Sequence, residues 1–328
     1  MNAAMSAGAL VSARGATVTF NHGGLINRTP PVRAVTDVDL DISAGEAVGL
    51  VGESGSGKST LGRLLLGLLQ PTAGHVSFEG RRLDTLSRRE WRALRRRMQI
   101  IFQDPYGSLD PRRRIGVQIA DGLAIPGLAA GSALKTEVAQ RLAAVGLDPS
   151  HAERYPHEFS GGQRQRIGIA RALAPDPAFL VADEPVSSLD VSIQAQIMEL
   201  LDRVRQERRL ALLFISHDLP VVRRLADRVL ITYLGRIVEA GPAATVLGRP
   251  AHPYTRALVS ATPRIAAGKR PSRIILPGDP PSPSAPPSGC AFRTRCAHAV
   301  DACAAVVPPM QKLGLDHAAA CTRLSEIG

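Results

Sequence analysis

The sequence predicts an α/β fold, in which short buried strands alternate with helices. Three apolar runs, residues 47–51, 178–182 and 210–215, have the length and composition of strands buried on both faces. Helical patterns follow each of them along the chain. Gly-rich or acidic segments come directly after these runs, at the strand ends where open α/β sheets bind their ligands.

Composition is consistent with a large folded chain that has a basic surface. The 328 residues are 45% hydrophobic and 21% charged, and the formal net charge is +11. Aromatic residues are only 4%, so the spread-out arginines do not form a stacking platform for single-stranded nucleic acid. We expect an ordinary solvated Arg-rich surface, with contact to a membrane surface or membrane protein as the alternative.

No apolar run reaches the length of a membrane span, and the first twelve residues lack the basic start of a secretory signal. We therefore expect a cytoplasmic location. Residues 16–20 and 35–42 alternate as antiparallel strands do, with a Gly/Pro loop between them. Phe20 ends the first of these strands and is either an adenine-stacking ring or an ordinary aromatic of the sheet.

A phosphate-binding loop follows the buried run 47–51. The segment fits G-x-x-x-x-G-K-[ST] and leads into a helix, so its backbone N–H groups and the helix N-terminus can cradle phosphates. Lys58 would reach the β- and γ-phosphates, and the Ser59 hydroxyl would bind Mg²⁺. The nucleotide-binding residues predicted here are Gly52, Glu53, Ser54, Gly55, Ser56, Gly57, Lys58, Ser59 and Thr60.

The middle of the chain predicts an inserted helical subdomain. Residues 88–97 have the pattern of a basic helix and residues 98–103 that of a strand, which the Pro-containing segment 104–111 cannot continue. Residues 115–123 and 133–145 are the helix candidates that follow.

Two further helix starts carry polar residues suited to anions. Ser160 is a natural N-cap, and Gly161, Gly162 and Gln163 open its helix; the segment is either an ordinary capped helix or a second anion-binding element. Residues 187–190 cap a helix over residues 191–205. A hairpin is expected at residues 228–239, across Leu234 and Gly235.

Two acids and a histidine follow the later buried strands. Asp183 and Glu184 suit different tasks beside a phosphate loop, Asp183 in the Mg²⁺ shell and Glu184 in polarising water. His217 follows the strand at residues 210–215 and can donate a hydrogen bond to a γ-phosphate.

In this order, the phosphate loop, Gln103, Ser160–Gln163, Asp183–Glu184, residues 187–190 and His217 resemble the ATP-binding cassette of ABC transporters. The resemblance covers about residues 14–260. It implies a P-loop NTPase fold with a RecA-like core sheet, an antiparallel β subdomain and a helical subdomain at about 104–165. We assign the ATPase domain to residues 1–260 and a C-terminal extension to residues 261–328.

The resemblance also implies roles for individual residues, with ATP and Mg²⁺ as ligands. Gln103 would sense the γ-phosphate and metal, Asp183 would bind Mg²⁺ through water, and Glu184 would be the general base. His217 would be the switch histidine. The resemblance assigns the segment that starts at Ser160 to the γ-phosphate of ATP on a second subunit and Asp190 to the same interface.

Four stretches resemble the oligopeptide/dipeptide/nickel importers: residues 102–112, 252–258, 276–283 and 289–296. The Pro-Tyr-x-Ser-Leu version within the first stretch is similar to their second ATPase subunit. The resemblance implies a sister or identical ATPase subunit, two transmembrane permeases and an extracytoplasmic solute-binding protein as partners, and no nucleic acid. It places the chain peripherally, at the cytoplasmic face of the cell membrane. A soluble ABC ATPase acting on ribosomes or DNA and an exporter motor are the alternatives.

All four cysteines lie in the last forty residues, with the spacing C-x5-C-x6-C-x17-C. This matches neither a zinc knuckle nor a ferredoxin run. Relatives suggested by the resemblance carry an iron–sulfur cluster there, so a [4Fe–4S] cluster, a zinc ion and reduced unligated thiols all remain open. The residues concerned are Cys290, Cys296, Cys303 and Cys321.

Overall fold

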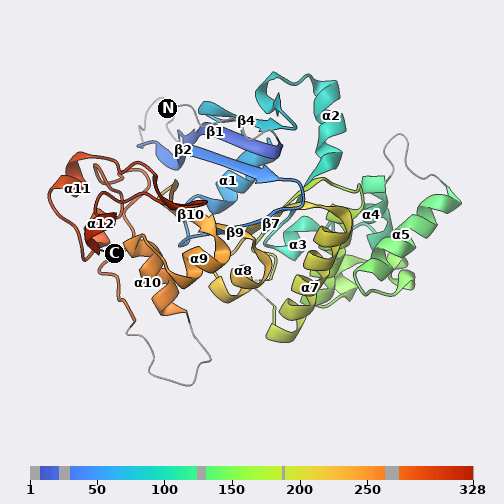
Figure 1. The fold of residues 1–328 in the computed structure, drawn as a ribbon. Helices are drawn as coiled ribbons and strands as arrows, with labels where there is room; N and C mark the ends of the chain where they lie inside the picture. Colours follow the sequence, from blue (N-terminus) through green and yellow to red (C-terminus); the bar gives the residue numbers. More distant parts are fainter. Residues whose placement is uncertain (1–7, 22–29, 124–130, 187–188, 263–272, 328) are drawn as a thin grey trace. The chain divides into compact units, whose positions relative to one another are not determined.

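The structure is a computed structural model, and it describes residues 8–21, 30–123, 131–186, 189–262 and 273–327 (Figure 1). The side chains of residues 105 and 106 lie outside that description, as do residues 187 and 188. The chain divides into two compact units. The phosphate-loop unit comprises residues 11–42, 47–84 and 214–328, and the helical unit comprises residues 1–10, 43–46 and 85–213.

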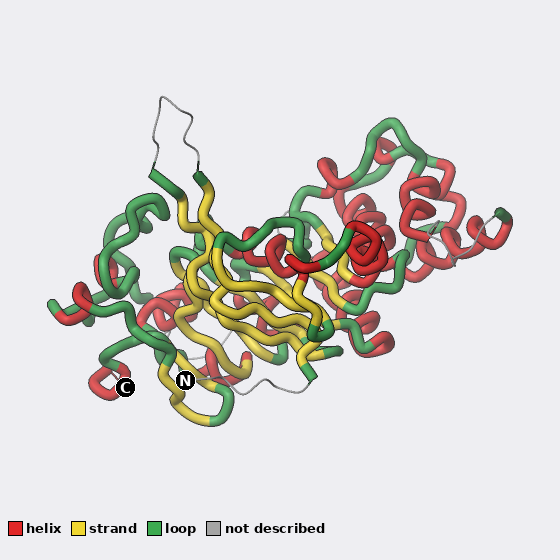
Figure 2. Tube along the Cα trace, turned by 90° about the horizontal axis from the view of Figure 1, so that it is seen from above, coloured by secondary structure: helices red, strands yellow, loops and turns green. Residues whose placement is uncertain are grey.

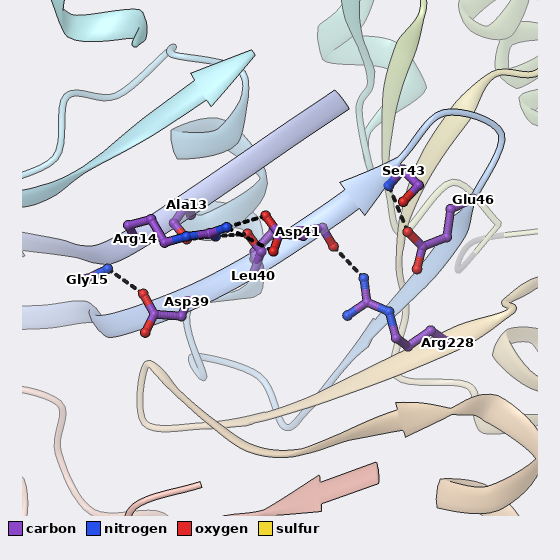
Figure 3. A network of polar contacts seen from close by, with 9 residues as sticks. All are labelled: Ala13, Arg14, Gly15, Asp39, Leu40, Asp41, Ser43, Glu46 and Arg228. Atoms are coloured by element: carbon purple, nitrogen blue, oxygen red, sulfur yellow. Dashed lines mark hydrogen bonds and ion pairs between the residues drawn. The ribbon is translucent and has the colours of Figure 1, made fainter. Parts of the chain in front are cut away.

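A four-stranded antiparallel sheet in the phosphate-loop unit has the order β2-β1-β4-β5. Its strands are β1 (Ala9–Phe20), β2 (Val32–Ser43), β4 (Ala73–Phe78) and β5 (Arg81–Arg82). Alternate residues of β2, namely Val38, Leu40 and Ile42, are buried, so one face of the strand supplies core. Figure 3 shows how Arg14 of β1 binds the Asp41 carboxylate on β2, with its Nη2 2.6 Å from Oδ1.

The second set of strands in this unit has the order β11-β12-β10-β9-β3 and carries the phosphate loop (Figure 2, yellow). The strands are β3 (Ala47–Val51), β9 (Arg228–Tyr233), β10 (Arg236–Pro242), β11 (Gln311–Gly314) and β12 (His317–Ala319). β3 runs parallel to β9, and all five of its residues are buried. Leu234 and Gly235 both have positive φ, 44° and 76°, as a two-residue hairpin turn between right-twisted strands requires.

Helices fill the rest of the phosphate-loop unit. They are α1 (Lys58–Leu65), α8 (Leu219–Leu225), α9 (Ala243–Gly248), α10 (Pro253–Ala261), α11 (Ala302–Ala305) and α12 (Leu324–Ile327). The short 3-10 turns η1 (Leu83–Thr85) and η4 (Arg293–Arg295) complete the set. Residues 273–287 contain neither helix nor strand, as their prolines predict. The backbone of Arg33, at the start of β2, donates to the Pro283 carbonyl, so this linker is attached to the unit.

In the helical unit the strand order is β8-β7-β6, and β6 runs parallel to β7. Its strands are β6 (Met98–Ile101), β7 (Phe179–Asp183) and β8 (Ala211–Ile215), which crosses the boundary between the units. The helices are α2 (Arg88–Arg97), α3 (Pro105–Ser108), α4 (Ile115–Leu123), α5 (Ser132–Ala144), α6 (Gly161–Leu173) and α7 (Val191–Arg208), with 3-10 turns η2 (Pro149–Glu153) and η3 (Pro156–Glu158). All residues of β7 are buried, so this strand is central to its layer.

The predicted α/β class and ABC-type elements are confirmed, including the helices near residues 115–123 and 133–145. The sequence missed three things. β1 begins at Ala9 rather than at residue 16, α7 continues to Arg208, and the tail contains the β11–β12 hairpin. The tail strands escaped prediction because most of their residues are exposed and show no alternation.

Candidate functional site

The phosphate loop holds its lysine by backbone carbonyls. Lys58 Nζ donates to the carbonyl of Gly52 at 2.8 Å and to that of Glu53 at 2.9 Å. The lysine is only 6% exposed. A buried ammonium needs such partners, because burial without hydrogen bonds disfavours the charge. The loop therefore keeps a cation in place where the motif predicts a phosphate.

At two positions of this loop the structure leaves no room for any residue other than glycine. A Cβ on Gly57 would lie 2.0 Å from the Ala34 carbonyl oxygen, and its φ of 94° is in the left-handed region. A Cβ on Gly52 would lie 2.3 Å from the carbonyl oxygen of Thr232. Beside them, the buried Ser56 hydroxyl lies 3.1 Å from the Thr232 hydroxyl. Close backbone approach thus explains the glycine spacing of the motif.

Other predicted residues lie in the same unit as the loop. Ser59 and Thr60 are in the first turn of α1 and are half-buried. The N–H of Ser216 donates to the Leu50 carbonyl at 3.2 Å, which brings the exposed His217 to the end of β3 from which the loop starts. Phe20 is the half-buried last residue of β1.

The helical unit brings Gln103 and Glu184 together. Gln103 Nε2 donates to Glu184 Oε2 at 2.9 Å. Asp183 is the buried last residue of β7, and Glu184 follows with a φ of 46°. A non-glycine residue with this backbone costs about 1–3 kcal/mol, and such strain gathers at functional sites. The acid that the sequence proposed as base is therefore held in a conformation that the strand alone would not choose.

The start of α6 is capped and remains accessible. Ser160 Oγ accepts from the Gln163 N–H at 3.3 Å, and Gln163 Oε1 accepts from the Ser160 N–H at 3.0 Å. These two bonds form the capping box, and Ser160 is exposed. A Cβ on Gly162 would lie 2.9 Å from Ile193 Cγ2, so α6 and α7 meet closely at this glycine.

Asp190 performs the capping predicted for the segment 187–190. Its Oδ1 accepts from the Ile193 N–H at 2.9 Å and from the Ser192 hydroxyl at 2.6 Å. The bond from Ser192, followed by that from Ile193, lowers the pKa of the Asp190 carboxyl, so it is ionised at the helix N-terminus. The other predicted capping residues, Ser187 and Ser188, lie outside the described residues.

Comparison with known proteins agrees with this geometry. Residues 35–187 match the family model described as ABC transporter, and residues 238–303 match the model described as oligopeptide/dipeptide transporter, C-terminal region. A Brucella ovis protein named for peptide import ATP binding is 53% identical over 296 residues, which cover 90% of this chain and 93% of the relative. The chain is an ATP-binding subunit of the ABC transporter family.

Two further matches support the assignment. The di/tripeptide transport ATP-binding protein DppF of Pseudomonas aeruginosa is 47% identical over 290 residues, 88% of this chain and 90% of that protein. An ATP-binding cassette solved as a dimer with ADP and Pi has 29% identity and a TM-score of 0.65, covering 71% of this chain and 98% of the solved one. The predicted family and ATPase activity are thereby confirmed.

A basic groove marks the helical unit of this ABC subunit. It has a volume of about 550 Å³, and its charged lining residues are Arg92, Arg95, Arg96, Arg113, Arg171, Asp110 and Asp121, so arginines outnumber carboxylates. Arg113 is paired with Asp121 at 2.7 Å. Burial lowers the pKa of Arg171, yet an arginine with its high intrinsic pKa stays charged at neutral pH. Phe102, one of the lining residues, directly precedes Gln103 in the chain. Within the described residues, no helix is both long and apolar enough to cross a membrane.

The four cysteines of the ABC subunit's tail line one small cavity of about 20 Å³, together with His298. Burial raises the pKa of three of the thiols, those of Cys290, Cys296 and Cys321. Nowhere in the described part of the chain are three or more His, Cys, Asp or Glu side chains arranged to hold a metal ion. The four thiols are soft donors that lie near one another at the expected cluster site, but they are not arranged to ligate a metal.

One contact of the site was not predicted. The Arg295 guanidinium binds the Glu53 carboxylate of the phosphate loop, with Nη1 2.7 Å from Oε2. The tail motif contains this arginine, but the two residues are 242 positions apart. Only a pattern that relates the loop to the tail could have revealed the contact, and a single sequence contains none.

Proposed function

We propose that this chain is the ATP-hydrolysing motor of an importer for peptides or related solutes. The observation that carries the proposal is the Gln103–Glu184 hydrogen bond, at 2.9 Å, at the end of a buried strand. A half-buried carboxylate there, oriented by a neutral amide, is suited to accept a proton from water. The oligopeptide/dipeptide match over residues 238–303 supports import as the process that is driven.

The loop residues would bind the triphosphate. Lys58, released from its carbonyl partners, would pair with the β- and γ-phosphates, and the loop N–H groups with the α1 N-terminus would surround them. Hydroxyl, amide and carboxylate oxygens suit Mg²⁺, which stabilises charge on the phosphates when bound. The oxygens proposed for it belong to Ser59, Gln103 and Asp183.

Glu184 would take the proton of the attacking water, and His217 would donate a hydrogen bond to the γ-phosphate. Phe20 is proposed for the adenine ring. Ser160 is exposed and Gly161 and Gly162 are half-buried at the N-terminus of α6, where helices bind anions, so we assign this segment to ATP bound by a second ATPase subunit, either identical or a sister. Asp190 would lie at that interface.

Two transmembrane permeases and an extracytoplasmic solute-binding protein complete the proposed assembly at the cytoplasmic face of the membrane. The basic groove supports permease docking, because its arginines complement the negative C-terminal end or the acidic side chains of a permease helix. Nucleic acid has no place in this proposal. The solved dimer with ADP and Pi supports a two-subunit working form.

For the tail, we propose a [4Fe–4S] cluster on Cys290, Cys296, Cys303 and Cys321. The chemistry of the donors supports it, because four thiols line one cavity. Their side chains are not in a ligating arrangement in this structure, so a cluster would have to reorient them and would keep them as thiolates. Anaerobic purification followed by iron, sulfide and zinc analysis decides between a [4Fe–4S] cluster, a zinc ion and reduced thiols without a metal. Absorbance at about 400 nm with both iron and sulfide supports the cluster; zinc alone, or none of these elements, contradicts it.

The ATPase proposal is tested by Glu184→Gln. The amide keeps the shape of the side chain but cannot accept the proton, so the variant should bind ATP and accumulate as ATP-containing dimers. Light scattering with and without ATP measures the dimer, and bound nucleotide is identified by chromatography. A variant that hydrolyses ATP as the wild type does, or that never dimerises, contradicts the assigned role.

A further inference from the structure

Glu53, the second residue of the phosphate loop, is held at three of its groups. Arg295 Nη1 and Nη2 donate to its carboxylate oxygens at 2.7 and 3.2 Å. Its N–H donates to the Tyr254 hydroxyl at 2.9 Å. Its carbonyl accepts from Lys58 Nζ at 2.9 Å. The position of one loop residue is therefore fixed both by the lysine that serves phosphate and by residues more than 200 positions away.

The two distant partners are themselves fixed. Tyr254 is fully buried at the start of α10, and Arg295 is 7% exposed at the end of η4. Three rings, those of Tyr233, Tyr254 and Phe292, pack with centroids 4.8 to 5.4 Å apart. Phe292 directly precedes the η4 turn that carries Arg295. The guanidinium is thus held in place before a nucleotide arrives.

The charge at Glu53 needs such a partner. A carboxylate in the phosphate loop repels the triphosphate that the loop is built to bind. A paired guanidinium cancels that charge and at the same time fixes the carboxylate in one orientation. At 26% exposure, the Glu53 side chain is too buried for water to screen the charge fully.

We propose that Arg295 and Tyr254 are positioning residues of the nucleotide site, and that the C-terminal extension thereby sets the affinity of the phosphate loop for ATP. Neither residue touches the reacting atoms; both act through Glu53. The inference rests on the ATPase function proposed above. It gives the tail a task in the motor itself, because the loop carries part of its shape and charge balance in contacts that only the tail and α10 supply.

The signature of positioning is a change in KM without a matching change in kcat. In Arg295→Gln the Glu53 carboxylate loses the guanidinium that balances its charge. The uncompensated carboxylate then weakens the binding of the ground state and of the transition state by the same amount. The KM and the dissociation constant for ATP should rise roughly tenfold, while kcat stays within about twofold. Arg293→Gln is the matched control, because Arg293 lies in the same turn but donates to the Ser288 carbonyl.

The experiment measures steady-state ATPase and binding of a fluorescent ATP analogue on the full-length chain. In the double variant of Glu53→Gln with Arg295→Gln the repelling charge is gone, so affinity should return to the level of Glu53→Gln alone. Equal KM values for the Arg295→Gln and Arg293→Gln variants overturn the inference, as does a double variant that binds ATP more weakly than Arg295→Gln. A wild type without turnover would instead remove the proposed function.

A second variant decides the matter if Arg295→Gln does not fold. Tyr254→Phe keeps the buried ring and removes only the acceptor of the Glu53 N–H. The KM for ATP should rise about threefold with an unchanged kcat. An unchanged KM in this variant, with the fold intact by circular dichroism, overturns the inference.

Discussion

Two glutamates of this ATPase illustrate how the surroundings of a carboxylate decide its task. Glu53 lies in the phosphate loop and is paired with the guanidinium of Arg295. Glu184 lies at the end of β7 in the helical unit and accepts a hydrogen bond from the neutral amide of Gln103. The guanidinium fixes the orientation of the Glu53 carboxylate and balances its charge. The amide orients the Glu184 carboxylate without adding a charge beside it, which suits a group that receives a proton from water.

The largest expected effect separates the two glutamates in turnover. Glu184→Gln should lower kcat about 10³-fold, because removing a general base costs 10²- to 10⁴-fold. Glu53→Gln should leave kcat within about threefold, because its carboxylate does not exchange protons with the reaction. Steady-state phosphate release at saturating Mg-ATP measures both. Similar losses of kcat in the two variants would break the comparison.

Backbone placement in the phosphate loop gives the next largest effect. Gly57→Ala puts a Cβ 2.0 Å from the Ala34 carbonyl oxygen, so the loop must shift. We expect a loss of roughly 3 kcal/mol in unfolding free energy and loss of ATP binding. Gly55→Ala, at φ +77° but in open space, is the control and should cost only about 1 kcal/mol. Urea unfolding and analogue binding test the pair; equal costs would contradict the account.

His252, which accepts a hydrogen bond from Tyr254, predicts that the stability of the protein depends on pH. Burial lowers the pKa of His252 to about 4, and its Nδ1 accepts from the Tyr254 N–H at 3.1 Å. In the unfolded chain, His252 binds a proton as the pH falls below the ordinary histidine pKa. In the folded chain it does not bind this proton until about pH 4. Acid between these values therefore stabilises the unfolded state.

As the pH falls from about 7.5 to about 5, protonation of His252 in the unfolded chain alone should lower the unfolding free energy by about 2 kcal/mol. His252→Asn retains a helix-capping acceptor without this titration. Urea unfolding at both pH values should show a smaller loss for the variant than for the wild type. Parallel losses in the two proteins would exclude His252 as the cause.

The smallest effect concerns another arginine–carboxylate pair of the same unit. Arg14 and Asp41 join β1 to β2, but their side chains are 29% and 35% exposed, so water screens their attraction (Figure 3). Asp41→Asn should cost less than about 1 kcal/mol of unfolding free energy. It should leave the KM for ATP unchanged, in contrast to Arg295→Gln. A raised KM would mean that ion pairs in this unit act on the loop without specific contact.

Local patterns predicted most of the candidate site. The phosphate loop, the Ser160 cap, the acids after β7 and the histidine after β8 each depend on a few neighbouring residues, so spacing alone reveals them. The resemblance then predicted their roles, which the experiments above test. The proposed boundaries, 1–260 and 261–328, stay predictions.

Contacts between distant segments could not be predicted. The Glu53 contact with Arg295 joins positions 242 apart, and nothing in either local sequence indicates the other. The positive φ of Glu184 is likewise imposed by packing, since a glutamate has no preference for it. The closeness of the four cysteines in the sequence predicted a metal or cluster site. Ligation depends instead on the directions of their side chains, which the fold sets.

Solute uptake by the chain reconstituted in vesicles with the two permeases and the solute-binding protein proposed above tests the central claim most directly. With a labelled pool of peptides of mixed length and Mg-ATP on the side of this chain, we predict ATP-dependent uptake that is lost in Glu184→Gln and retained in Glu53→Gln at saturating ATP. Uptake that persists in Glu184→Gln would contradict the account.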